Sequence, residues 1–142
     1  MLKISGLKGF ADGVTSTYTA ALMEPYLDKP ETSGTLNYPA AQFQKWTAEA
    51  NRKGYGVRVH CIGDYAVHMM LDACEQSNQR NDNEQIRNSI EHIEVIDPQD
   101  IPRFQKLGVI PSMQPLHLPL DRFDKRYRVG RERSMYEWAM KS

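Results

Sequence analysis

Three of the four histidines in this 142-residue sequence lie in or just after short apolar runs. His60 ends the run VRVH, His92 lies within NSIEHIEV, and His117 follows the run VIPSMQP. A neutral imidazole is the commonest metal ligand among protein side chains, and it also donates to or accepts from polar substrates. If the fold brings these three imidazoles together, they could bind a divalent metal ion or a substrate.

Each of these histidines also has a structural interpretation. A histidine at the end of a strand is often a hydrogen-bonded core residue, but three at equivalent positions favour a functional site. His68 differs because it lies inside a predicted helix, where solvent exposure or packing is the default. Asp64 has three candidate roles: it could cap that helix, accept from a loop amide or orient His60, and we expect capping.

The elements that must position these side chains alternate between strands and helices. Val, Ile and other apolar residues in short runs predict strands at residues 7–10, 57–62, 88–95 and 109–115. Apolar spacings of three and four residues predict helices at residues 39–54, from residue 64 through Cys74, and at residues 97–108. This alternation is typical of βα units with a parallel sheet, so we expect an α/β fold.

Local signals predict where two of the helices begin and end. Asn37 is a candidate cap for the first helix, with Pro39 in its first turn. Asp97 is the candidate cap of the last helix, Pro98 occupies its first turn, and Gly108 ends it.

Parallel sheets bind ligands at the carboxyl ends of their strands, where the three histidines are predicted to lie. Strand alternation places Arg58 with His60 on one face and Ile90 with His92 on one face of the next strand. Imidazoles from neighbouring strands could then approach one ion. Residues 14–38 form a long segment without periodicity, which either covers the site or is an exposed connection.

Composition narrows the range of partners. The sequence has 18 basic and 18 acidic side chains and no block of one sign, which argues against a nucleic-acid or membrane partner. We expect a small-molecule substrate. No apolar stretch resembles a membrane span or a secretory signal, so we expect a cytoplasmic protein whose Cys61 and Cys74 are buried reduced thiols.

The segments GLKGFADG, HCIGDYAV, SIEH and LGVIPSMQPLH, in this order, resemble the amidohydrolase superfamily, and specifically the amidohydrolase family 3 of metal-dependent hydrolases. The resemblance runs over nearly the whole chain. It implies a deformed (β/α)8 TIM barrel, of which this chain covers about strands four to seven. It also implies that His60 and His92 bind a divalent metal, usually zinc. Lys8 stands where some members carry a carboxylated lysine that bridges two metal ions.

The activity implied by the resemblance is hydrolysis of carbon–nitrogen bonds other than peptide bonds, such as amides or formamides. A metal-activated water would attack the substrate carbonyl. His117 could polarise that carbonyl, while Asp12 and Gly13 could line the substrate pocket.

The sequence also departs from the family pattern. It has no His-x-His pair, which members carry on strand one, and no candidate for their strand-eight aspartate. We therefore expect the middle of such an enzyme, either a fragment or a truncated gene product, inactive in isolation and binding its metal weakly or not at all. An incomplete barrel would expose an apolar face with Phe10, Ile90 and Met113, so we expect self-association or association with the missing barrel half. The alternative is a non-catalytic βα domain that self-associates.

Overall fold

The computed structural model describes residues 4, 6–81, 85–117 and 125–136. Its centre is a parallel sheet of four strands in the order β1-β2-β3-β4. The strands are β1 (Gly6–Phe10), β2 (Gly56–Cys61), β3 (Ser89–His92) and β4 (Ile110–Met113). The helices are α1 (Ala40–Arg52), α2 (Asp64–Arg80), α3 (Ile101–Leu107) and α5 (Arg131–Ser134), with 3-10 turns η1 (Thr15–Thr17), η2 (Pro98–Asp100) and η3 (Pro115–His117). Residues 125–129 are also helical.

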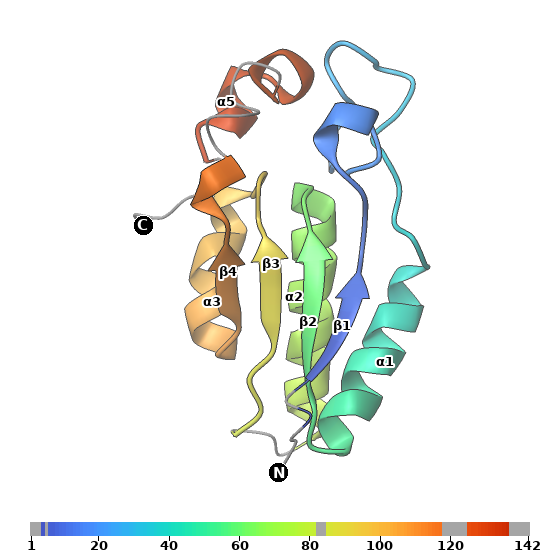
Figure 1. Cartoon of the computed structure of the whole chain (residues 1–142), viewed down its shortest axis with the longest axis vertical. Helices are drawn as coiled ribbons and strands as arrows, with labels where there is room; N and C mark the ends of the chain where they lie inside the picture. The colour runs from blue at the N-terminus through green and yellow to red at the C-terminus, as the bar shows by residue number, and fades with distance from the viewer. Residues whose placement is uncertain (1–3, 5, 82–84, 118–124, 137–142) are drawn as a thin grey trace.

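This arrangement confirms the predicted βα alternation. Among the described residues, β1 and β4 each pair on one side only, so the sheet is open, as expected of part of a barrel. Figure 1 shows the strands pointing the same way, with the loop after β1 and the C-terminal helical segment beyond their carboxyl ends. None of the helices in the described parts of the chain is long and apolar enough to cross a membrane.

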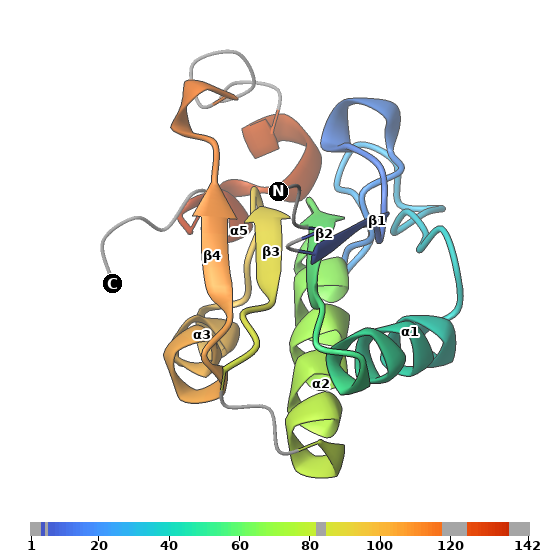
Figure 2. The ribbon, with the colours of Figure 1, turned by 60° about the horizontal axis from the view of Figure 1, so that its bottom comes forward.

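The two faces of the sheet differ. Figures 1 and 2 show α1, α2 and α3 on one side of the strands. Val59 and Ile90 are paired in register and buried in the core beneath these helices. The opposite face carries Lys8, Phe10 and Arg58, which are exposed because no described element covers it.

Two of the three apolar residues predicted for that open face, Ile90 and Met113, lie elsewhere, and Met113 is partly buried against the core under the helices. Ile90, expected to lie exposed with Phe10, is fully buried on the helix side, because its register places it beside Val59. Phe10 does lie on the open face, with 55% of its surface exposed.

Two predicted helix caps are also wrong. Pro39 takes the N-cap position of α1, and the Asn37 amide instead donates to the carbonyls of Phe10 and Asp12. Gly63 is the N-cap of α2, so Asp64 is the first helical residue. By contrast, the Asp97 side chain accepts from the Gln99 amide as a cap should.

The long segment at residues 14–38 contains η1 and is fastened to the rest of the molecule. Asp64 Oδ1 accepts from the Met23 amide at 2.9 Å, which is the loop-amide role rather than the expected cap. A second apolar cluster ties this segment to the end of β3 and to the C-terminal helical segment: Leu22, Tyr26, Val95 and Val129. The segment is therefore packed rather than a free connection.

Candidate metal centre

His60 and His92 meet at the carboxyl ends of β2 and β3. Their ring centroids are 4.5 Å apart, in an edge-on arrangement. His117, at the end of η3, stacks on His92 with centroids 5.7 Å apart. The structure therefore brings together three imidazoles that are far apart in the sequence.

Regular strand alternation does not explain this meeting. Register pairs His92 with Cys61, which is buried in the core under the helices, so a regular strand would turn His92 away from His60. Instead, His92 and Ile93 have left-handed backbone conformations, with φ values of 75° and 54°. Each of these two left-handed conformations costs roughly 1 kcal/mol or more for a residue with a Cβ. This turn ends β3 at His92, earlier than predicted, and brings its ring to the open side.

The ring of His60 is held by the backbone of the loop after β1. Its Nε2 lies 2.9 Å from the Gly13 carbonyl oxygen, and because a carbonyl only accepts, Nε2 must donate. The lone pair of a neutral His60 then lies on Nδ1. A metal-ligating histidine usually donates its other ring nitrogen in this way.

Oδ1 of Asp12 lies 3.8 Å from Nε2 of His60, but the carboxylate accepts its hydrogen bonds from backbone amides. Oδ1 accepts from the Ile62 amide, and Oδ2 accepts from the amides of Ala21 and Gly63. Burial raises the pKa of Asp12 to about 6, although the three amides favour its ionised form. Asp12 thus connects the loop after β1 to the turn before α2, and Gly13 contributes its carbonyl to His60.

Lys8 lies on the open face, and its ammonium forms an ion pair with Glu91 of β3. This contact reaches across β2. A carboxylated lysine is an anion, so a carboxylated Lys8 would have to separate from the Glu91 carboxylate.

Glu94 is a candidate ligand that the sequence interpretation missed. It is buried two residues beyond His92, its Oε1 lies 3.4 Å from His117 Nδ1, and its other oxygen pairs with the buried Lys125 ammonium. Ligand atoms of His92, Glu94 and His117 all lie within 4.8 Å of one another. The sequence did contain a signal for Glu94: in the segment SIEHIE, this carboxylate residue follows the candidate ligand His92 by two positions.

His92 is suited to binding as a neutral base. Burial lowers its pKa, and the nearby charge of His60 lowers it further. Its Nδ1 is buried without a hydrogen-bond partner among the described residues. Such an atom is unusual in a folded protein, and a bound ion or water would satisfy it.

His68 lies outside this site, as expected. Its Nδ1 contacts the buried Asp100 carboxylate of η2 at 3.0 Å, and its own side chain is partly exposed. Arg103 joins this network by binding Asp100, Asp72 and Glu75.

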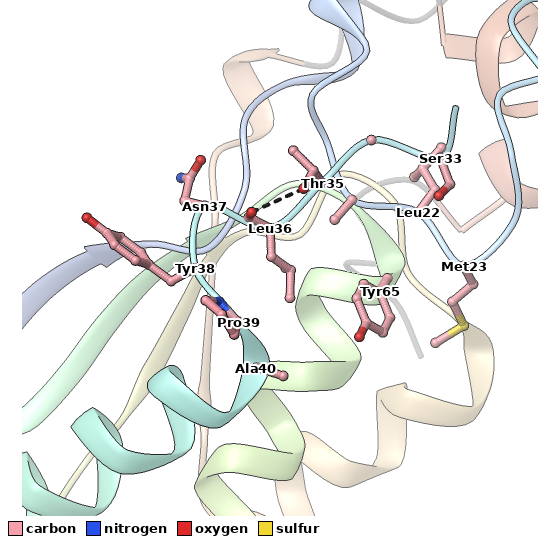
Figure 3. Close-up of a pocket in the computed structure, with 12 residues that line it drawn as sticks. Leu22, Met23, Ser33, Thr35, Leu36, Asn37, Tyr38, Pro39, Ala40 and Tyr65 are labelled. Carbon is pink, nitrogen blue, oxygen red and sulfur yellow. Dashed lines mark hydrogen bonds between the residues drawn. The ribbon is translucent and has the colours of Figure 1, made fainter. Parts of the chain in front are cut away.

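Two clefts also lie away from the histidines. Figure 3 shows one of about 640 Å³, lined by the segment at residues 33–40, by Ala21 to Met23 and by Tyr65 at the start of α2. The other, about 780 Å³, is an apolar groove along β4 and α3 that includes Ile96, Phe104 and Ile110. Neither is lined by a histidine.

Comparisons with known proteins match nearly the whole chain. The sequence model of the amidohydrolase family matches residues 1–140. Two solved structures, uncharacterized metal-dependent hydrolases from Pyrococcus furiosus and Pyrococcus horikoshii, match with 35% and 32% identity over 95% of this chain, each with a TM-score of 0.83. The protein LONG AFTER FAR-RED 3 of Arabidopsis thaliana is 32% identical over 96% of the chain.

The matched parts of these proteins are small. The chain covers 27% and 26% of the two solved structures and 23% of the Arabidopsis protein. It therefore spans about a quarter of the length of each.

Proposed function

Because this chain belongs to the amidohydrolase family, we propose that it carries part of the metal site of a hydrolase that cleaves carbon–nitrogen bonds other than peptide bonds. Amides and formamides are the substrate class. The observation that supports this best is that the rings of His60 and His92, which come from separate strands, have centroids 4.5 Å apart. A divalent ion of the zinc class is the cofactor in this proposal.

The residues at this position suit such an ion. His60 Nε2 donates to the Gly13 carbonyl, so its Nδ1 offers a lone pair, and burial favours the neutral form of His92. A bound divalent ion supplies Lewis-acid chemistry, in which a carbonyl is polarised and water becomes a nucleophile at neutral pH. In this proposal, His117 is half-exposed beside His92 and donates to the substrate carbonyl oxygen.

Proton transfer is the step for which the carboxylates beside the histidines are already engaged. Asp12 accepts from three amides, Glu91 pairs with Lys8, and Glu94 pairs with Lys125. A general base must have a free lone pair within hydrogen-bond reach of the proton it removes. We therefore expect the isolated chain to hydrolyse amides no faster than background.

Metal binding by the isolated chain tests the proposal. We expect weak uptake of Zn²⁺ by equilibrium dialysis, because two histidines fall short of the three or four protein ligands of typical zinc sites. Uptake should be lost in a His60→Ala, His92→Ala double variant. His68→Ala is the matched control, since that ring contacts the Asp100 carboxylate of η2. A folded wild-type chain that takes up no zinc would contradict the proposal.

Hydrolysis provides the second measurement. Ammonia release from simple amides and formate release from N-formyl compounds should stay at background, with and without Zn²⁺. Zinc-dependent turnover that disappears in His60→Ala would support the function and show that the expected inactivity is wrong.

A second candidate is a non-catalytic βα domain that acts by association. The exposed Phe10 and Ile110 on the open face, and the apolar groove beside β4, favour this alternative. This alternative would be supported by a folded protein that takes up no metal and whose folding is unchanged in the His60→Ala, His92→Ala double variant.

A further inference from the structure

Three metal-ligating side chains converge beyond the ends of β3 and β4, and the sequence did not group them. Their ligand atoms lie within 4.8 Å of one another. We propose that His92, Glu94 and His117 form a site for a divalent cation of the zinc class. The inference rests on the proposed function and deepens it, because it assigns His117 to the ion instead of the substrate carbonyl.

The distance between Glu94 and His117 supports an ion between them. Oε1 of Glu94 and Nδ1 of His117 are 3.4 Å apart. Charge-assisted hydrogen bonds between nitrogen and oxygen are shorter, at about 2.7–2.9 Å. Two atoms that each lie about 2.1 Å from one tetrahedral ion are about 3.4 Å apart. The observed separation therefore suits two ligands better than a direct bond.

His92 supplies the third ligand. Its Nδ1 is buried and has no partner among the described residues, although the strained left-handed backbone turns this ring to the open side. Unpaired buried polar atoms and strained backbone together are typical of functional positions.

Lys125 positions Glu94. The buried ammonium holds one carboxylate oxygen, so the other faces the imidazole of His117. The apolar cluster that contains Val95 and Val129 fixes both chain segments next to this ion pair. Glu94 is thus presented in one orientation, which lowers the entropy lost on binding an ion.

Of the other predicted ligands, Lys8 pairs with Glu91, whereas His60 keeps a lone pair on Nδ1 because its Nε2 donates to Gly13. Together, His92, Glu94 and His117 offer two imidazoles and one carboxylate, the ligand types of many catalytic zinc sites, which keep a fourth position open.

Calorimetric titration of the metal-free chain with Zn²⁺ tests this site. We expect one equivalent to bind, and both Glu94→Gln and His117→Gln to weaken binding by more than about 100-fold, since losing even an outer partner costs about 10- to 100-fold. Glu91→Gln and His68→Gln are matched controls that should bind as wild type. Titration with Co²⁺ should give a visible absorption band that both test variants lose.

The outcomes separate this inference from the proposed function. His117 is half-exposed, so its variant should fold even if loss of the buried Glu94 charge disturbs folding. Wild-type affinity in His117→Gln would overturn the inference. If zinc binding is instead lost in His60→Gln and kept in both test variants, the inference fails while the proposed function stands. A folded chain that binds neither ion would overturn both.

Discussion

At the scale of single residues, the acidic side chains near the carboxyl ends of the strands serve the backbone or pair with lysines. Asp12 and Asp64 both accept from amides of the segment after β1, and Glu94 pairs with Lys125. The bonds of Asp12 and Asp64 explain how a long segment with little regular structure is held against the start of α2. The imidazoles, and the Glu94 oxygen that faces His117, are the groups left to do chemistry.

Asp64 provides a pH prediction at this scale. Burial raises its pKa above the ordinary value of 3.8, more than its bonds to the amides of Met23 and Tyr65 lower it. A raised carboxyl pKa in the folded state means that the unfolded chain ionises first, so stability falls as pH rises from below 3.8 through the folded pKa. Asp64→Asn keeps Oδ1 as the acceptor for both amides and removes this titration.

We therefore expect the free energy of unfolding of Asp64→Asn to equal that of wild type near pH 3 and to exceed it at pH 7. Urea denaturation across that range measures both free energies of unfolding. A variant that loses stability relative to wild type as pH rises would show that Asp64 is stabilised, not destabilised, as an anion.

At the scale of elements, a buried polar cluster joins α1, α2 and the residue before β3. Asn51 and Asn88 exchange two side-chain hydrogen bonds of 2.9 and 3.0 Å, and Ser77 donates to Asn51. Asn88 also accepts from the Val57 amide at the start of β2. Because all three polar side chains are buried and paired, the cluster specifies how the helices sit on the sheet.

Asn51→Ala should destabilise the chain by about 2 to 3 kcal/mol, because it leaves the Asn88 amide and the Ser77 hydroxyl buried without their partner. Urea denaturation measures this loss. The double variant with Asn88→Ala should cost less than the sum of the single changes, since both remove one network. Additive costs would mean that the two asparagines act independently.

At the scale of the whole molecule, the described sheet has two free edges and one uncovered face. Phe10 and Ile110 lie on that face at opposite edges, 55% and 47% exposed. An apolar groove runs along the β4 edge. Surfaces of this kind associate with other protein surfaces in water.

We predict that the chain self-associates through this open face. Light scattering at micromolar concentration should give a mass above that of one 16.3 kDa chain. Phe10→Ser with Ile110→Ser should shift the mass toward the monomer, whereas Leu116→Ser should not, since Leu116 is exposed but lies outside the sheet. A wild-type monomer at this concentration would contradict the prediction.

The order of the elements and the family could be predicted from the sequence. Apolar periodicity, the Asp97 cap and the Gly108 C-cap are local signals, and the structure agrees with them because each depends on neighbouring residues. The same signals placed His60 near the end of its strand and His92 late in the next strand, which the structure ends at His92. Their arrangement at the carboxyl edge then follows from the parallel sheet.

Only the tertiary structure decided which way His92 points and what stands beside it. Alternation along a regular strand would turn His92 toward the core, but left-handed backbone at two consecutive residues reverses this. The neighbourhood of Glu94, His117 and Lys125 was equally hidden, as was the role of Asp64. These features depend on contacts between residues that are distant in the chain. Such contacts offset the cost of the strained backbone, and a local sequence pattern does not reveal them.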